Sequence, residues 1–484
     1  MNERLAFGFG PSGRRGEAPG RPAAESHPAE PAQAAEVQTS ENSSARRDWA
    51  FMGLMAFTAL LYFRPQDQLP PLGALRLTEI AALVGLLGLA FNRLGRGLSP
   101  TRMTPELAGV VALGLIILAL APFSIWMGGA IGTFTDLYMK VMLIFLLMVN
   151  TLNSPKRIEQ FTWLIVVAVG YMSFRAVFDY ARGINLIENG RVQGALGGMF
   201  QNPNDLALNL VAMLPLAVAL ALRAKTSLRR LGALASAALM VGAIVATHSR
   251  SGSIGLGVMV LMIGGMLVRR RPRLAVVGGF VLLLAVPLTP TSYWQRIASI
   301  TDESQDDTGS REARSILMRE AWAAFLAHPV TGVGAGQFKN YAPDGRVEAW
   351  REAHNVLLQV AAELGIAGFL VFAFLIVRGA MARGQTRKLL RRASGVSARG
   401  QPERPAVITT NEAADLELFS AAVFAGLVGW FVCAFFASVA YHWTFYYLLA
   451  LAIAPREVLR DRLAAAMPAR RRFAGSLVPQ EARV

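Results

Sequence analysis

The sequence predicts an all-α polytopic membrane protein, and three observations point to that class. Of the 484 residues, 54% are hydrophobic and only 17% are charged, whereas about a quarter of the residues are charged in a soluble globular protein. Long apolar segments recur along the chain, each close to the roughly 20 residues that a helix needs to cross a bilayer. Basic residues concentrate in the loops on alternate sides of those segments, as the positive-inside rule requires of a multi-pass protein.

The apolar segments divide the chain into about twelve candidate transmembrane helices. They fall near residues 49–63, 75–92, 105–126, 134–152, 158–178, 206–222, 231–248, 253–268, 274–290, 356–377, 418–439 and 441–455. Residues 48–290 would therefore hold the first nine spans, and residues 356–456 the last three.

The distribution of Lys and Arg predicts the orientation of these spans. With the N-terminus inside, basic runs such as 269–273 and 378–404 fall in internal loops, and the short external loops carry few basic residues. We therefore expect both termini in the cytoplasm, a solvated basic cytoplasmic loop at 378–416 that is attracted to anionic lipids, and one large, partly helical periplasmic loop at 291–355. The net charge of +16 lies mainly between apolar runs and in the tails, so we expect no nucleic-acid partner.

The two tails and the single cysteine have simple interpretations. Residues 1–47 are rich in Pro, Ala, Glu, Ser and Gly, and such a segment buries too little apolar surface to fold, so we expect a disordered cytoplasmic tail. It lacks the apolar core of a signal peptide, and residues 457–484 would form the cytoplasmic C-terminal tail. Cys433 lies in an apolar run, which excludes an intrachain disulfide and favours a small core residue.

The large external loop contains a helical pattern that carries three arginines. Arg311 and Arg314 are three residues apart and share a helix face, whereas Arg319 points about 140° away. An arginine can hold phosphate oxygens through two parallel hydrogen bonds and keeps its charge. The pattern therefore predicts either a phosphate-binding face or a solvated helix in which Glu312 and Glu320 pair with the arginines.

Glycines follow that helix, and a histidine ends the loop. The amides around Gly332, Gly334 and Gly336 could form an anion nest or a simple turn; the Gly-Lys-Ser/Thr of a nucleotide-binding P-loop is missing. A second polar helix should lead to His354 and Asn355 at the mouth of a span. A neutral imidazole there could accept a proton from a hydroxyl group, although a histidine bonded to backbone at the membrane interface fits the position equally well.

A further arginine stands at an external span end. Arg250 lies in the run THSRSGSIG, and an arginine in that position must face water, protein or an anion, or snorkel to the interface. We favour a functional role because it opposes the general charge bias. The polar segment 191–205 could line a sugar or headgroup site or form a re-entrant turn, and Lys140, Arg175 and Glu363 inside apolar runs should find ionic partners.

Motifs for metal binding are not evident in the external segments. These segments contain no His-Glu-x-x-His, no cysteine cluster and no Asp-x-Asp pair, and Asp306 and Asp307 stand in a flexible acidic run. We therefore expect neither a metal nor a cofactor. Any chemistry on a phosphate would depend on arginines for charge stabilisation.

Several of these runs resemble the O-antigen ligase and O-antigen polymerase superfamily. The resemblance rests on HPVTGVG at 328–334, HNVLLQ at 354–359 and ELG at 363–365, and the patches at 194–204 and 249–252 are similar to others in the family. It covers most of residues 50–455. The combination of HPxxGxG with HN is fairly specific for the superfamily, but it does not specify the acceptor.

The resemblance implies a metal-independent, inverting glycosyltransferase of the bacterial inner membrane. Such an enzyme moves a glycan en bloc from undecaprenyl diphosphate to an acceptor hydroxyl on the periplasmic side. His354 matches the general base, and Arg250 and Arg314 match arginines that hold the diphosphate; we prefer Arg314 because it keeps the spacing to His328. The remaining candidates for substrate binding are Arg191, Asn202, Asn204, Arg311, Arg319, Gly332, Gly334 and Asn355.

The acceptor and one competing function class remain open. A polymerase transfers to another carrier-linked glycan, and a ligase transfers to lipid A core or a glycoprotein. The run RPQD at 64–67 resembles members found with exopolysaccharide gene sets, which slightly favours a polymerase or ligase of secreted glycan. The alternative class is a transporter or a flippase of lipid-linked glycans, also commonly of twelve spans, but the paired halves typical of transporters are not visible in the sequence.

Overall fold

The computed structural model describes residues 48–466 except 69, 188–189, 196–199, 286, 288, 299–309, 344–345, 347–349 and 396–405. The predicted tail 1–47, the acidic run at Asp306–Asp307 and the end of the C-terminal tail lie outside the described residues. The described residues belong to one compact unit, Asp48–Val484.

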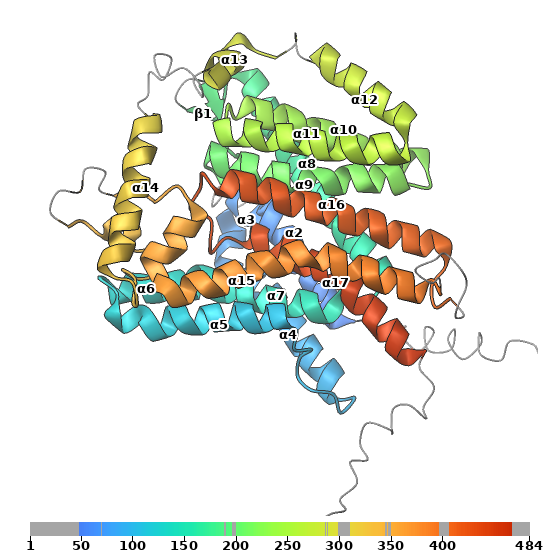
Figure 1. The fold of residues 1–484 in the computed structure, drawn as a ribbon, viewed down its shortest axis with the longest axis horizontal. Coiled ribbons are helices and arrows are strands. Elements are labelled where there is room, and N and C mark those ends of the chain that lie inside the picture. The colour runs from blue at the N-terminus through green and yellow to red at the C-terminus, as the bar shows by residue number, and fades with distance from the viewer. Residues whose placement is uncertain are drawn as a thin grey trace, which may run out of the picture. The chain divides into compact units, whose positions relative to one another are not determined.

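Within the described residues the protein is helical apart from one short hairpin, which confirms the predicted all-α class (Figure 1). Strands β1 (Leu186–Ile187) and β2 (Arg191–Val192) pair antiparallel, with Leu186 opposite Val192. The helices are α2 (Trp49–Phe63), α3 (Pro65–Gln68), η2 (Pro70–Leu75), α4 (Leu77–Leu94), α5 (Pro105–Leu120), η3 (Ala121–Phe123), α6 (Met127–Gly132), η4 (Thr133–Tyr138), α7 (Met139–Thr151), α8 (Pro155–Arg182), α9 (Pro203–Arg223), α10 (Ser227–Ala246), α11 (Arg250–Arg270), α12 (Pro272–Ala285), α13 (Thr291–Ala298), α14 (Ser310–Ala327), η9 (Phe338–Asn340), α15 (Val356–Ala393), α16 (Thr410–Ala434) and α17 (Trp443–Ala465).

Nine of the helical segments in the described residues are long and apolar enough to cross a membrane. Every predicted span overlaps a helix, but three of these helices fall outside the nine. Helices α2 and α12 have only 15 and 14 residues, and α17 carries Arg456 and Glu457 in its middle. The structure thus supports a multi-pass membrane protein without establishing twelve crossings.

Two helices extend beyond their predicted ends. Helix α15 continues to Ala393, so the first part of the predicted loop 378–416 is helical; this segment is rich in Arg, Lys, Leu and Ala, which favour helix. Helix α17 likewise runs to Ala465, into the predicted tail 457–484. The predicted spans ended where charged residues begin in α15 and α17, because hydropathy falls there. Charged residues do not by themselves end a helix.

Helix α9 lies at the centre of the packing. It contacts α8, α10, α11 and α16, and nearly every residue from Leu206 to Ala221 is buried. Its buried Asn209 forms a hydrogen bond of 3.2 Å with Thr444 of α17. Helix α15 packs beside α5, α16 and α17, and Cys433 is fully buried among these helices, which confirms the core role predicted for it.

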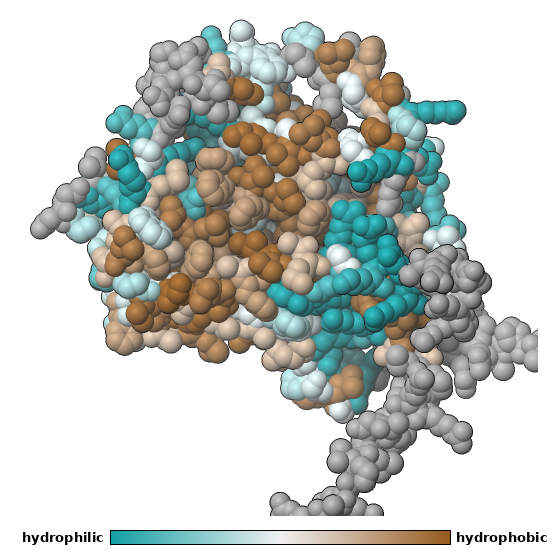
Figure 2. Space-filling view, in the orientation of Figure 1, coloured by the Kyte–Doolittle hydropathy of each residue, from teal (hydrophilic) through white to brown (hydrophobic). Residues whose placement is uncertain are grey.

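The helix bundle has two chemically different ends. We call the end where α9, α11, α15 and α17 begin the loop end, and the end where they finish the basic end. Figure 1 shows α6, α13, α14 and β1 at the left, at the loop end. Figure 2 shows apolar side chains across the middle of this face and hydrophilic ones gathered at the right, over the ends of α15 and α16.

An ion-pair network fastens the basic end. The buried carboxylate of Glu106 on α5 accepts two hydrogen bonds of 2.8 Å from Arg456 of α17 and another of 2.8 Å from Arg378 of α15. The hydrogen bonds of such a bidentate pair offset the free-energy cost of removing the two charges from water. The network therefore joins three helices, α5, α15 and α17, at this end.

Candidate functional site

A break in α15 forms the foundation of the site. Gly365 has φ 60° and ψ −161°, which is not helical and is open essentially only to glycine. A Cβ atom at this position would lie 2.6 Å from the carbonyl oxygens of Pro329 and Val330. The loop after α14 therefore approaches the α15 backbone too closely for any side chain at Gly365.

The broken helix and the loop satisfy each other's backbone groups. A break in a helix releases carbonyl and amide groups that must find new partners when they are buried. The hydrogen bonds run from Val333 N to Ala362 O (2.9 Å), from Gly334 N to Glu363 O (2.9 Å) and from Ile366 N to Pro329 O (2.8 Å). The HPVTGVG run is thus a docking segment for α15.

This docking corrects the prediction of an anion nest. The Gly332 amide donates to His328 O, and the Gly336 amide donates to a Glu363 carboxylate oxygen, both at 2.9 Å. With the Gly334 amide also engaged, these amides are committed within the protein and do not point at a ligand. Gly332 and Gly334 belong to the site as packing residues: a Cβ at Gly332 would collide with the Glu363 backbone, and one at Gly334 with Ser124.

Glu363 links the docked loop to the connection between α16 and α17. Its buried carboxylate also accepts a hydrogen bond of 2.8 Å from the Tyr441 hydroxyl. The other charged residues within apolar runs have local partners: Lys140 lies 3.7 Å from Glu79, and Arg175 lies 3.9 Å from Asp179. The predicted ionic pairing is therefore confirmed for Lys140 and Arg175, with partners outside the three residues, whereas Glu363 is bonded to a hydroxyl and a backbone amide.

Asn355 caps α15 and is not available as a ligand-binding side chain. Its Oδ1 accepts hydrogen bonds of 3.0 Å from the amides of Leu357 and Leu358, and its Nδ2 donates to Phe435 O at 3.1 Å. This is the usual role of Asn before a helix. The predicted polar helix before it is wrong, because η9 is the sole helical turn in the described part of residues 337–355.

His354 lies just before this cap, in a constrained backbone position. Its φ is 49°, and its amide donates a hydrogen bond of 3.0 Å to the Ser438 side chain. Together with the bonds made by Asn355 and Glu363, this contact ties the start of α15 to the segment 435–441. The backbone that carries the imidazole is therefore held at the start of α15 by several independent hydrogen bonds.

Burial and the charges around His354 keep its imidazole neutral. Burial, followed by the positive charges of Arg314 and Arg351, lowers its pKa from 6.5 to about 4. Between pH 6.5 and 4 the unfolded chain binds a proton that the folded chain does not, so this group's contribution to stability is lost as the pH falls through that window. At neutral pH the ring keeps a lone pair that can accept a proton.

The three arginines of α14 have different environments. Arg314 is half-buried and acts electrostatically on His354. Arg319 is exposed, and its Nε contacts Ser315 O at 3.4 Å. The side chain of Arg311 lies outside the described residues. Of the described pair, Arg314 is therefore the one associated with the imidazole.

A second polar group surrounds the start of α11, where Arg250 is the first helical residue. Arg191 donates to Thr247 O at 3.1 Å and to the Asn204 side chain at 2.9 Å. Ser249 donates to the same Asn204 oxygen at 2.8 Å. Asn204 and Arg191 thus fix the turn that presents Arg250.

Asn202 has a local role at the start of α9. Its side chain accepts a hydrogen bond of 2.8 Å from the Asn204 amide, which is a helix N-cap. The residue is exposed. Its effect on the site is therefore to position Asn204.

Two carboxylates join the groups around Arg250 and His354. Asp205, next to Asn204, interacts electrostatically with Glu352, two residues before His354. Arg250 and His354 both lie at the loop end of the bundle, where α11 and α15 begin.

The sequence interpretation missed several members of this site. Arg351 and Glu352 were recognisable only as polar neighbours of His354, and Asp205 only as a polar neighbour of Asn204. Arg346 was also missed: it pairs with Glu320 at 3.2 Å, lies 4.4 Å from the Phe338 ring and donates to Phe338 O, so it stabilises the loop. Nothing local in the sequence distinguishes it from a solvated arginine.

Comparison with known proteins gives a family match, which covers part of the chain. Residues 235–373 match the family model described as O-Antigen ligase. The matched range begins in α10 and ends in α15, so it contains Arg250, Arg314, the docking segment and His354. The group at 191–204 precedes it. No match was found among curated proteins.

Proposed function

We propose, from the premise that this chain belongs to the O-antigen ligase/polymerase superfamily, that it transfers a glycan en bloc from undecaprenyl diphosphate to an acceptor hydroxyl. The loop end then faces the periplasm of the bacterial inner membrane. The observation that carries the proposal is a neutral imidazole at the mouth of α15, under the electrostatic influence of Arg314 and Arg351.

The chemistry follows from these groups. The acceptor oxygen attacks the anomeric carbon from the face opposite the diphosphate, the bond between that carbon and the phosphate oxygen breaks, and the diphosphate leaves. His354 takes the proton of the attacking hydroxyl. One base is enough for this single displacement, which inverts the anomeric configuration.

The guanidinium groups stabilise the leaving group. Negative charge builds up on the departing diphosphate, and preorganised cations stabilise it most strongly in a site sheltered from water. Arg314 and Arg351 provide this charge beside His354, and Arg250 provides it at the start of α11, where the helix dipole also favours an anion. In this proposal the arginines supply the positive charge that a divalent metal supplies in other enzymes acting on phosphates.

The bound diphosphate also activates the base. In the free protein burial, and after it the positive charges of Arg314 and Arg351, lower the pKa of His354, which makes the ring a weak base. A diphosphate beside those arginines compensates their charge and raises the pKa of the ring towards neutrality, where a general base is most effective. The imidazole thus becomes a competent base when the donor is present.

The acceptor is not decided by these residues. A ligase and a polymerase need the same donor chemistry and the same base, and they differ only in the hydroxyl that attacks. Lipid A core, a glycoprotein or another carrier-linked glycan could each supply that hydroxyl.

An exchange of arginine for lysine on α14 tests the diphosphate role. Arg314→Lys is expected to reduce transfer at least about tenfold, because a point charge does not replace a bidentate guanidinium. Arg319→Lys, the matched control on the exposed side of the same helix, should retain wild-type transfer. Turnover is measured with purified protein and a lipid-diphosphate-linked oligosaccharide. Equal losses in both variants, or none in Arg314→Lys, would contradict the assignment.

A further inference from the structure

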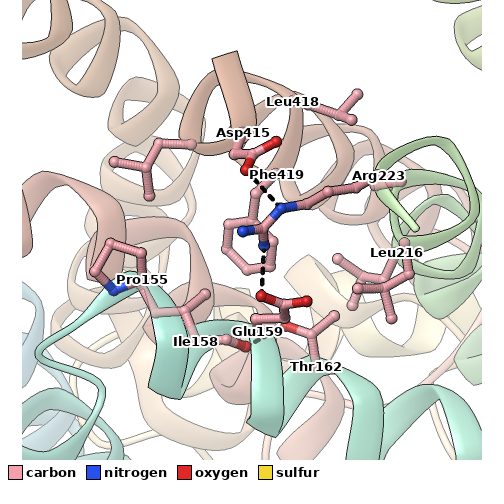
Figure 3. A pocket seen from close by; sticks show the side chains of 12 residues that line it. Pro155, Ile158, Glu159, Thr162, Leu216, Arg223, Asp415, Leu418 and Phe419 are labelled. Atoms are coloured by element: carbon pink, nitrogen blue, oxygen red, sulfur yellow. Dashed lines mark hydrogen bonds and ion pairs between the residues drawn. The ribbon is translucent and has the colours of Figure 1, made fainter. Parts of the chain in front are cut away.

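A groove opens at the basic end, far along the helices from the site described above (Figure 3). It lies between the start of α8, the end of α9 and the start of α16. Its walls are largely apolar, with Ile158, Leu216 and Phe419 among them. The groove thus runs along the last turns of α9, within helices that are apolar enough to cross a membrane.

An arginine stands at the mouth of this groove. Arg223, the last residue of α9, pairs with Glu159 of α8 at 3.2 Å and with Asp415 of α16 at 2.8 Å. Figure 3 shows its guanidinium between the two carboxylates. The single positive charge of Arg223 is therefore shared between two carboxylates, and this trio keeps a net negative charge unless other cations lie close by.

A second, more polar pocket adjoins the groove. The two share Glu159, Leu220 and Arg223, and the second adds Trp163, Lys225 and Arg229. Lys225 and Arg229 are exposed, and their side chains make no ion pair within the described part of the chain. The groove and the polar pocket together thus have three cationic side chains, Arg223, Lys225 and Arg229, against the two carboxylates that Arg223 joins, which leaves a positive balance at Lys225 and Arg229.

We propose that the groove and the adjoining pocket together bind one anionic phospholipid. Its phosphate lies against Lys225 and Arg229, and the first part of an acyl chain covers the shallow apolar wall of the groove beside Leu216 and Phe419. Cationic pockets between helices at the membrane surface suit anionic headgroups, and Trp163 is a residue type favoured at that depth. The phosphate of a zwitterionic lipid such as phosphatidylcholine is already balanced by its own choline, so that lipid brings no net negative charge to the two cations. A soluble anion would leave the groove empty.

The bound lipid should strengthen the packing of three helices. Arg223 already joins α9 to α8 and α16 through its two ion pairs, and the lipid would fill the apolar space below that junction. Under the proposed orientation this site faces the cytoplasmic leaflet. It is independent of the transfer chemistry, because it lies at the opposite end of α9 from Asn204 and Asp205.

Native mass spectrometry of the full chain with added phosphatidylglycerol or phosphatidylcholine tests the proposal. The double variant Lys225→Gln with Arg229→Gln should retain phosphatidylglycerol about tenfold less well than wild type, since each basic residue near the headgroup contributes to binding. The matched control is Arg271→Gln with Arg273→Gln, which removes two exposed charges from another loop at the same end. This control variant should retain phosphatidylglycerol as wild type does. Phosphatidylcholine should bind weakly to wild type and to both double variants.

A second variant probes the acyl part of the site. Ala219 lines the groove, so Ala219→Phe should fill it and weaken retention of phosphatidylglycerol while leaving both cations in place. Undiminished retention in this variant or in the glutamine double variant would overturn the proposal, as would an equal loss in the control. Displacement of the lipid by millimolar inorganic phosphate would overturn it too, because the site would then recognise free phosphate.

Discussion

Removal of the His354 side chain is expected to abolish glycan transfer while the protein still folds and inserts. A general base contributes about 10²–10⁴-fold to a rate, and the ring is the candidate base at the mouth of α15. The assay uses purified protein in EDTA, a lipid-diphosphate-linked oligosaccharide and an acceptor, with product measured by mass spectrometry. His354→Ala should give at least a hundredfold loss in turnover, about as large as the general-base effect allows.

A glycine variant separates chemistry from structure at this position. His354 has φ 49°, a conformation that glycine adopts without strain, so His354→Gly should keep the backbone and the hydrogen bond to Ser438. Free imidazole added to this variant should restore part of the turnover, because a small base can occupy the vacated space. Full activity in either variant would exclude His354 as the base; absence of rescue together with a lowered unfolding temperature would indicate a structural role.

Gly365→Ala is expected to undock the loop from α15 and lower both stability and transfer. The residue would occupy a conformation that costs a non-glycine about 1–3 kcal/mol, and its Cβ would lie 2.6 Å from two carbonyl oxygens. Displacement of the loop would also break the three backbone hydrogen bonds between the docking segment and α15, each of which contributes about 1 kcal/mol to stability. Thermal unfolding in detergent and the transfer assay should both show the loss.

The same helix offers a matched control for this prediction. Gly384 also lies in α15, and a Cβ there would meet no atom within 4 Å. Gly384→Ala should therefore be neutral or stabilise the helix by about 0.5–1 kcal/mol. Loss of stability in the Gly384 variant comparable to that in the Gly365 variant would show that α15 tolerates no added methyl group, and the docking account would fail.

The sequence predicted those parts of the fold that depend on local composition. Apolar runs predicted the helical segments, because a backbone in lipid must satisfy its hydrogen bonds internally. The 140° separation of Arg314 and Arg319 agrees with one being half-buried and the other exposed. Predicted helix ends failed where α15 and α17 continue as charged helices beyond the apolar stretch.

The site was predictable only in part, because its geometry depends on contacts between distant segments. The glycines near 332–336 looked like a ligand-binding turn, but their amides bond to Ala362 and Glu363, which are about 30 residues later in the chain. The break at Gly365 interrupts a run that otherwise has a continuous helical pattern. Likewise, no local signal related Asp205 to Glu352.

The titration of His354 tests most directly whether the imidazole and the arginines form one diphosphate site. Purified protein with ¹³C-labelled histidine is titrated by NMR, and the His354 signal is assigned by its loss in His354→Ala. We predict a pKa of about 4 for this ring in the free protein, and a clear rise when undecaprenyl diphosphate is added but not with undecaprenol. An unperturbed pKa near 6.5, or one that does not respond to the diphosphate, would contradict the account.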